Sequence, residues 1–266
     1  MRYAYLAAAA ALAASLGSGR AGAQSLAERV RGAGEATVQL RFASRSGVCG
    51  DGRDMISTGG NSYMRGGWSS GDDSNWRKFC APGPVRVVMW TSHGTVNRLH
   101  VSIGGTDTAG GVYDLGTVPA HEASEYLLGL ARDGANSVGD DAILAAVLAD
   151  SATPWPSLLA LARDAHARDT RQSASFWLGR AAAAAVNRTA LFGEADAPAE
   201  TDDEAVRGQA IFALSQQRDD ESVPALIRVA RTNADPVLRS KALFWLSQSD
   251  DGRAIDLFAQ ILNAER

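Results

Sequence analysis

Residue types that could carry out covalent chemistry are few in this chain, and their spacing is unfavourable. Gly67-Trp68-Ser69-Ser70-Gly71 matches the G-x-S-x-G pattern of hydrolases. A serine in that pattern acts as a nucleophile only on a strained turn between a strand and a helix, with an acid and a histidine elsewhere in the chain. The residues around Ser69 are rich in glycine, and no helical pattern follows them. We therefore expect no nucleophilic role for Ser69.

Residues that could bind a metal are also poorly placed. The chain has 4 histidines, and none of them shows the short spacing typical of zinc ligands. Asp51, Asp54, Asp72 and Asp73 could offer oxygen ligands to Ca²⁺, but their order does not match that of an EF-hand loop. We favour a solvated acidic loop and leave calcium as the alternative. The sequence thus predicts no catalytic residue, no cofactor and no metal site.

The cysteine content points to a disulfide. The chain has 2 cysteines, Cys49 and Cys80. In an oxidising compartment such a pair within one small region is most often bonded. Closing a loop of about 30 residues contributes roughly 3 to 4 kcal/mol in the chain-entropy model. The alternative is a reactive thiol paired with a histidine, but no family signature surrounds either cysteine.

Residues 1–23 have the pattern of a secretory signal peptide. Arg2 precedes an apolar run, and Ala21-Gly22-Ala23 forms a small-residue cleavage site. The apolar run is shorter than the roughly 20 residues needed to cross a bilayer. We expect cleavage after Ala23, a periplasmic or secreted protein and no membrane-spanning segment.

The formal net charge of the chain is −4. Nucleic-acid binding depends on a basic stripe that neutralises phosphates. The mildly acidic balance of the chain therefore argues against a nucleic-acid partner.

The first part of the mature chain, residues 24–118, is expected to form a small β-rich domain. Alternation of apolar and polar residues predicts strands at 38–42, 85–90 and 96–103. The glycine-rich stretch between Cys49 and Cys80 has few apolar side chains and is predicted to be a long loop held by the disulfide.

Tryptophans in and near this loop form a second candidate contact region. Trp68 and Trp76 lie within the polar loop, and Trp90 lies close by in the chain. Exposed aromatic residues on a constrained loop can carry much of the energy of binding. A module that binds a sugar or a peptide through these residues is one alternative function.

From residue 119 onward the apolar spacing becomes helical, and the chain repeats itself. Residues 156–180 and 224–248 are similar and begin 68 residues apart, with a third, shorter copy at 206–215. Such a period is typical of stacked helix pairs. The pattern predicts about nine helices within the following ranges: 119–133, 138–150, 154–167, 169–183, 187–194, 202–216, 220–233, 235–248 and 251–264.

The stretches DPVLRSKALFWLSQSDDGRAIDLFAQIL and DDEAVRGQAIFALSQQRDDESVPALIRVA resemble bacterial HEAT repeats. The resemblance is good over about 154–264 and weaker over 119–150. It implies that residues 119–266 form a short α-solenoid. Members of the family are scaffolds for protein partners more often than enzymes.

Three sets of repeated residues have different expected roles. In the HEAT resemblance the arginines Arg171, Arg207 and Arg239 are structural. The pairs Phe176-Trp177 and Phe244-Trp245 recur at one repeat position and are expected to fill the core between helix pairs. Exposed polar residues on the helices could meet a partner, and four glutamines are candidates: Gln172, Gln209, Gln216 and Gln248.

The sequence therefore predicts an α+β multidomain protein with a disulfide-pinned β-rich domain followed by an all-α HEAT-like solenoid. We expect an exported, non-enzymatic interaction or scaffold module that is a monomer or weak oligomer and binds an unknown protein partner. A secreted hydrolase with its site in the β domain or at the domain junction is the other alternative, although no acid, base and nucleophile can be assembled for it.

Overall fold

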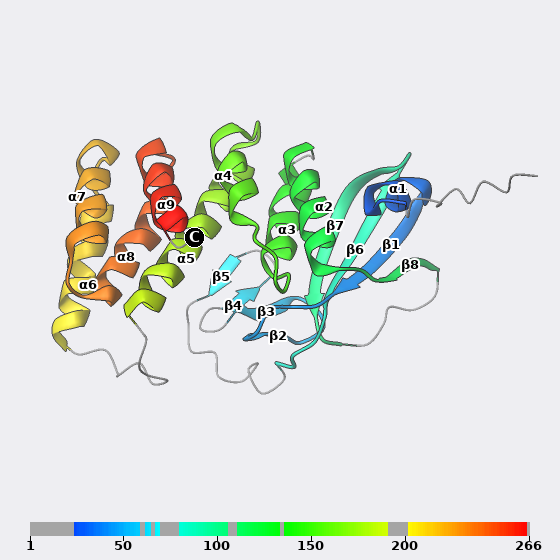
Figure 1. Cartoon of the computed structure of the whole chain (residues 1–266), viewed down its shortest axis with the longest axis horizontal. Helices are drawn as coiled ribbons and strands as arrows, with labels where there is room; N and C mark the ends of the chain where they lie inside the picture. Colours follow the sequence, from blue (N-terminus) through cyan, green and yellow to red (C-terminus); the bar gives the residue numbers. More distant parts are fainter. Residues whose placement is uncertain are drawn as a thin grey trace, which may run out of the picture.

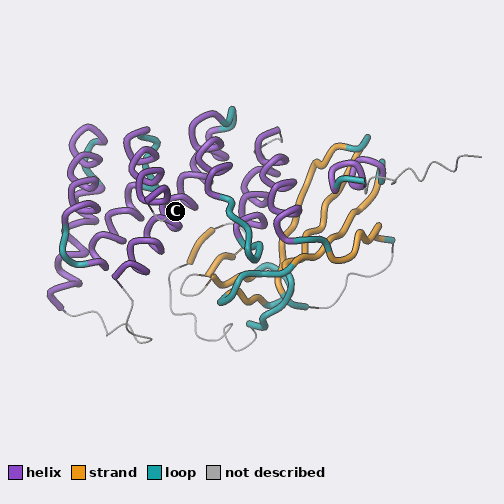
Figure 2. Tube along the Cα trace, in the orientation of Figure 1, coloured by secondary structure: helices purple, strands orange, loops and turns teal. Residues whose placement is uncertain are grey.

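The computed structural model describes residues 24–58, 62–64, 67–69, 80–105, 111–133, 136–190 and 202–264. The strands gather at one end of the molecule and the helices extend from them to the other end (Figures 1 and 2). The predicted fold class is confirmed: a β-rich region with a disulfide is followed by helical repeats. Within the described residues, no helix is both long and apolar enough to cross a membrane.

The main sheet has four strands in the order β7-β6-β1-β8. β6 lies antiparallel to both β1 and β7, whereas β8 pairs with β1 in parallel. The three strands expected in this region are confirmed, and β8 is an additional edge strand. The strands are β1 (Ala36–Phe42), β6 (Val85–Ser92), β7 (Thr95–Ile103) and β8 (Val112–Thr117).

A second small sheet replaces part of the predicted disulfide loop. Its order is β2-β3-β4-β5, with antiparallel neighbours, and its strands are β2 (Val48–Gly50), β3 (Met55–Thr58), β4 (Ser62–Met64) and β5 (Gly67–Ser69). The prediction of an irregular loop was wrong here because such short strands are held by backbone hydrogen bonds and need few apolar side chains.

The disulfide joins Cys49 and Cys80, whose Cα atoms are 5.3 Å apart. Beside it, Gly50 and Ala81 exchange two backbone hydrogen bonds of 3.0 and 2.8 Å. The predicted pairing of the two cysteines is thus present, and it fixes the start of the small sheet to the chain that enters β6.

Three helices cover the main sheet: α1 (Leu26–Gly32), α2 (Ala120–Asp133) and α3 (Asn136–Val147). Ser25 caps α1 in a capping box with Glu28. α3 packs on β7, and its end is tied to the end of β1, because Arg45 donates its backbone N–H to Leu148 (2.9 Å) and Asp150 donates to Ala43 (2.9 Å). Sheet and helices share one continuous apolar core.

The remaining helices are α4 (Trp155–Asp164), α5 (Arg168–Ala190), α6 (Asp202–Ser215), α7 (Asp219–Thr232), α8 (Pro236–Leu246) and α9 (Gly252–Ala264). They match the predicted segments except at one point. The separate helix predicted at 187–194 was wrong over residues 187–190, because α5 runs through them without a break, and residues 191–194 lie outside the described residues. Its run of alanines, the residue with the highest helix propensity, keeps this helix continuous.

Two arginines at equivalent positions of the sequence repeat make the same hydrogen bonds in the structure. Arg171 donates from Nη1 to the carbonyls of Ala165 (2.7 Å) and His166 (3.0 Å). Arg239 makes the same two bonds, to Asn233 (2.8 Å) and Ala234 (3.0 Å). Both arginines therefore hold the turn before their own helix, in α4–α5 and in α7–α8.

The order of the helices in space differs from their order in the chain. α8 packs between α5 and α6, and α9 lies between α4 and α7. Figure 1 shows the α8–α9 pair in the middle of the array, where the C-terminus also lies. The helices thus form two layers, α5-α8-α6 and α4-α9-α7, and the chain places α6–α7 at the far end before it returns toward α5.

Within the α8–α9 pair, α9 runs parallel to its neighbour α7 and antiparallel to its neighbour α4. Arg253 at the start of α9 donates to the carbonyl of Asp219 at the start of α7 (3.4 Å), as expected for parallel helices. On the other side, Arg163 near the end of α4 donates to Asp256 near the start of α9 (2.7 Å). Residues at the start of α4 and Leu262 near the end of α9 line one cleft, so α4 and α9 run antiparallel.

The α5–α8 contact depends on one glycine. A Cβ atom at Gly179 would overlap the Cβ of Ser247 and lie 3.2 Å from the carbonyl oxygen of Leu243. Gly179 and Ser247 occupy the same repeat position, 68 residues apart. The two repeat units therefore dock in opposite directions through equivalent positions.

Replacing this glycine tests the contact. We expect Gly179→Ala to lower the free energy of unfolding by about 1 to 3 kcal/mol, because the added methyl group meets the backbone of α8. The matched control is Gly129→Ala in α2, where a Cβ meets nothing within 4 Å. That variant should be more stable by up to about 1 kcal/mol, as alanine favours helix. Urea denaturation measures both, and stabilisation by Gly179→Ala would contradict the α5–α8 packing.

The disulfide provides a second test. Replacing both Cys49 and Cys80 with serine should lower the free energy of unfolding by about 3 kcal/mol, because the unfolded chain is no longer constrained. A reductant should shift the urea midpoint of the parent protein and leave that of the double variant unchanged. Equal midpoints for the reduced and untreated parent would show that the bond does not form in solution.

Candidate functional site

One cleft lies where the strand region meets the helices. Its volume is about 1100 Å³, slightly above the usual range for small-molecule sites. Segments far apart in the chain form its wall: the ends of β1, β3 and α3, the loop before α4, and helices α4, α5 and α9. The lining residues are Arg45, Ser46, Thr58, Val147, Leu148, Ala152, Thr153, Pro154, Trp155, Pro156, Leu158, Trp177, Arg180, Ala181, Ala184 and Leu262.

Arg45 enters the cleft from the segment after β1. The neighbouring bridge between Ser44 and Ala149 fixes the backbone there. The guanidinium donates to the carbonyl of Ala149 (3.5 Å). Burial lowers the pKa of Arg45, and the nearby carboxylate of Asp150 partly opposes that shift. The charge is thus held in a partly desolvated position.

Arg180 enters the cleft from α5. Its guanidinium carbon lies 5.7 Å from the centre of the Trp177 ring and 5.9 Å from that of Phe176, within the range of cation–π contacts. Its Nη2 donates to the hydroxyl of Thr58 on β3 (3.3 Å). Burial lowers the pKa of Arg180 as well. This side chain therefore links the helical array to the small sheet at the edge of the cleft.

The lining combines cationic, aromatic and apolar groups. Among the described lining residues two are arginines and two are tryptophans, and none is acidic. The hydroxyl groups of Ser46, Thr58 and Thr153 are present, but the described lining has no histidine or carboxylate to act as a general base. Such a wall can bind a negatively charged ligand that has an apolar body.

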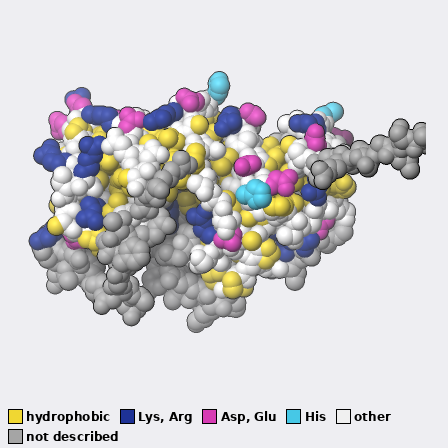
Figure 3. Space-filling view, viewed as in Figure 1, with side chains coloured by type: hydrophobic (Ala, Val, Ile, Leu, Met, Phe, Trp, Pro, Cys, Tyr) yellow, Lys and Arg dark blue, Asp and Glu magenta, His cyan; other side chains and the backbone are white. Residues whose placement is uncertain are grey.

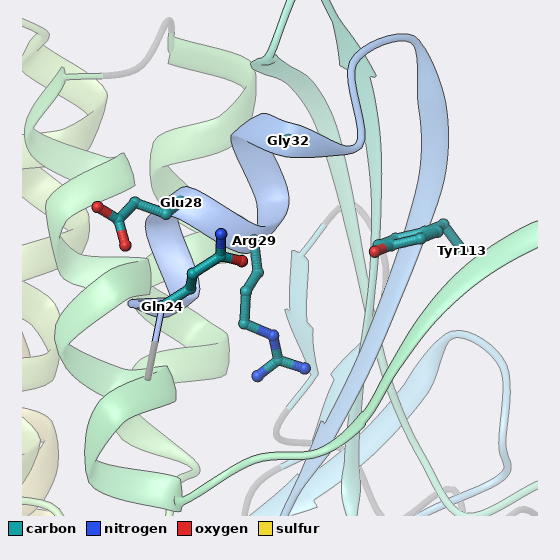
Figure 4. A pocket seen from close by; sticks show the side chains of 5 residues that line it. All are labelled: Gln24, Glu28, Arg29, Gly32 and Tyr113. Atoms are coloured by element: carbon teal, nitrogen blue, oxygen red, sulfur yellow. The ribbon is translucent and has the colours of Figure 1, made fainter. Parts of the chain in front are cut away.

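A second, smaller pocket of about 620 Å³ lies between α1 and β8. Figure 4 shows Arg29 between the helix and Tyr113, with Glu28 pointing away from the tyrosine. Arg29 already donates to the carbonyl of Leu115 (2.8 Å). The lining, which also includes Gln24 and Gly32, offers one carboxyl group, one guanidinium group and one aromatic ring, and it is less distinctive than the cleft.

The glutamines predicted to contact a partner are exposed on the α5-α8-α6 layer. Gln216 and Gln248 end equivalent helices, and each donates to the serine before it, Ser215 or Ser247 (3.3 Å in both cases). Gln209 lies on α6 with Gln216, whereas Gln172 lies on α5, on the other side of α8. The structure thus brings two of the four candidates, Gln216 and Gln248, into matching positions on adjacent helices.

Three aromatic residues precede these glutamines by three or four positions in the chain: Phe212, Phe244 and Trp245. The rings of Phe212 and Trp245 are 5.0 Å apart, and those of Phe244 and Trp245 are 5.1 Å apart. Phe212 and Phe244 are 41% and 39% exposed. The expectation that both members of each Phe-Trp pair fill the core needs correction: Trp177 and Trp245 pack at its edge, and Phe244 lies at the surface.

Other candidates from the sequence are less informative. Trp76 lies outside the described residues, and the side chains of Trp68 and Ser69 on β5 do as well. Trp90 packs under Arg98, whose guanidinium carbon is 4.6 Å from the ring centre. Asp51 accepts hydrogen bonds from Arg53 and Met55 within its own loop. No group of three metal-binding side chains occurs within the described part of the chain.

Sequence reasoning missed the two arginines of the cleft. One signal for Arg180 was available: the Ser-Gln pair of two repeat copies, 215–216 and 247–248, is Gly179-Arg180 in the third. Arg45 gave no signal, because its position depends on pairing between segments about 100 residues apart.

The paired helices with a repeated turn define a helical-repeat protein of the α-solenoid class. A family model described as HEAT repeats matches residues 197–266, which contain α6 to α9. The protein is therefore a HEAT-repeat domain-containing protein, as the sequence resemblance indicated. Searches of curated proteins and of solved structures found no match.

The two aromatic residues of α8 should respond differently to truncation. Trp245→Ala should lower the free energy of unfolding by about 3 kcal/mol, since the ring packs on the core and on Phe212. Phe244→Ala should cost less than about 1 kcal/mol, because this side chain is 39% exposed. Thermal and urea unfolding measure both. A Trp245→Ala variant as stable as the parent would mean that the tryptophan lies outside the packed layer.

Proposed function

We propose that this protein is an exported, non-enzymatic module that binds a protein partner through the outer surface of α6 and α8. HEAT repeats are suited to protein interaction. The observation that carries the proposal is the partly exposed aromatic group formed by Phe212, Phe244 and Trp245. We define this group, together with Gln216 and Gln248, as the α6–α8 surface.

The α6–α8 surface has the composition of a contact site. Gln216 lies four residues after Phe212, and Gln248 lies four residues after Phe244, so each glutamine shares a helix face with a phenylalanine. Aromatic residues dominate binding energy at protein interfaces, and polar neighbours supply hydrogen bonds at the rim. Figure 3 shows that hydrophobic side chains also reach the surface over the helices in several groups, with Lys and Arg side chains among them.

Export is supported by the signal-peptide pattern of residues 1–23 together with the disulfide. Residues 1–23 lie outside the described part of the structure. The proposal places the mature protein, cleaved after Ala23, in the periplasm or outside the cell. Its oligomeric state would be monomeric or weakly oligomeric, with residues 24–118 and 119–266 as its two domains.

Affinity capture tests the surface. The protein, used as bait in the exported fraction of its own organism, should retain a partner that mass spectrometry identifies. The double variant Gln216→Glu/Gln248→Glu should retain at least tenfold less of that partner, because two charges would be desolvated in the interface. Its free energy of unfolding should change by less than about 0.5 kcal/mol.

The control carries the same charge change elsewhere. Gln24 and Asn97 are exposed in the strand region, and Gln24→Glu/Asn97→Asp should retain the partner as the parent does. Equal loss in both double variants would indicate a general charge effect and would count against the α6–α8 surface.

A further inference from the structure

β8 is an edge strand of the main sheet, and it pairs in parallel with β1 alone. Arg41 on β1 accepts the backbone N–H of Val118 (2.8 Å), so alternate residues of β1 direct their backbone groups toward β8. In the register of this pair, Tyr113 faces β1, whereas Val112 and Asp114 direct their backbone N–H and C=O groups away from it. We call these three residues of β8 the β8 edge.

The outward backbone groups of Val112 and Asp114 have no hydrogen-bond partner among the residues that the structure describes. A row of such groups at the side of a sheet is a template for a further strand. The edge ends where the register shifts between Asp114 and Thr117. There the N–H of Gly116 bonds to the side chain of Asp114 (2.8 Å). The part of the edge that can pair therefore runs from Val112 to Asp114, with Tyr113 at its centre.

Tyr113 is the most exposed large hydrophobic side chain in the described part of the chain, at 54%. It lies opposite Val38, whose side chain is fully buried, so its ring is on the side of the sheet that the helices cover. Figure 4 shows the space between this ring and α1, the pocket whose lining includes Arg29 and Gly32. A side chain placed opposite Tyr113 on an added strand would lie on the same face of the sheet, beside this pocket.

We propose that the mature protein forms a weak dimer in which β8 pairs antiparallel with β8 of a second copy, about a twofold axis at Tyr113. Val112 then lies opposite Asp114 of the second copy, and each such pair exchanges two backbone hydrogen bonds. One self-complementary contact thus bonds the outward groups of both edges. The two Tyr113 side chains become direct cross-strand neighbours, an arrangement that stabilises sheets when both residues are aromatic.

The charges at the β8 edge suit a second copy. Asp114 is paired with Arg41 (2.8 Å), and the pocket beside Tyr113 contains Glu28 and Arg29. These carboxyl and guanidinium groups balance, so two copies do not repel each other, and a strongly charged peptide would gain no attraction. The contact is smaller than a standard stable interface, and we expect a dissociation constant of about 10 to 100 μM.

The dimer would carry two partner-binding surfaces. β8 lies at the end of the molecule opposite α6 and α7 (Figure 1). Pairing through β8 therefore leaves the α6–α8 surface of each copy uncovered, and a partner with two linked binding sites would gain affinity from both. Only this consequence rests on the proposed function, because the contact between the copies involves other residues.

Sedimentation of the mature chain, residues 24–266, from about 1 μM to about 1 mM tests the contact. The parent should show a reversible monomer–dimer equilibrium. Tyr113→Lys places two like charges opposite each other and should weaken the dimer by about tenfold or more. Val112→Pro removes an outward N–H without breaking a bond to β1 and should have a similar effect. The matched control, Phe244→Lys, makes the same kind of change at an exposed aromatic residue of α8 and should leave the dimer unchanged.

Cysteine crosslinking locates the twofold axis. In the proposed pairing the Cα atoms of residue 113 in the two copies lie about 4.5 Å apart, within the range of a disulfide. Tyr113→Cys should therefore form a covalent dimer under mild oxidation. Asn97→Cys, at an exposed position of the opposite edge strand β7, should not.

The outcomes separate this contact from the α6–α8 surface. A protein that stays monomeric up to about 1 mM overturns the proposal. A dimer that is unchanged by both β8 variants, or that crosslinks equally at both cysteines, overturns it as well. The Tyr113→Lys variant should still capture the partner of the α6–α8 surface. A parent protein that dimerises as described but captures no partner would count against the proposed function and not against this contact.

Discussion

The arrangement of the helices depends on the close approach of α5 and α8 at Gly179. Leu178 on α5 and Leu243 and Leu246 on α8 are fully buried, and burial of such side chains contributes roughly 1.5 to 3 kcal/mol each. The ion pairs that accompany this contact, Arg163–Asp256 and Arg168–Asp250, are exposed and add little. Apolar packing therefore holds the reversed pair in place, and a larger side chain at 179 would push α8 away from α5.

Because α5 and α8 run in opposite directions, the equivalent residues Trp177 and Trp245 on these helices have different surroundings. Where successive pairs stack in parallel, Trp245 is packed against a ring of the next helix. Where the direction reverses, the equivalent Trp177 lies beside the strand region, and the end of β1 and β3 supply the opposite wall. The cleft is thus a consequence of joining an array of helix pairs to a sheet through a reversed contact.

Local sequence patterns predicted most helices and strands of this structure well, because a helix or strand depends largely on residues that are close together in the chain. Alternation located β1, β6 and β7, and the 68-residue repeat located the turns that Arg171 and Arg239 hold. The reversed position of α8–α9 was not predictable, since sequence similarity between units is the same for any stacking order. The small sheet was missed because its strands have three or four residues each, too few to show a period.

Arg180 shows that a functional candidate can also depend on contacts that the sequence pattern does not reveal. At the equivalent position on α8, an exposed glutamine bonds to the preceding serine. On α5 the position holds a cation whose pKa is lowered by burial, so its environment disfavours the charge. The rings of Phe176 and Trp177 and the hydroxyl of Thr58 offset part of that cost. Groups from α5 and β3 thus act together on the Arg180 charge, and the repeat alone could not indicate that combination.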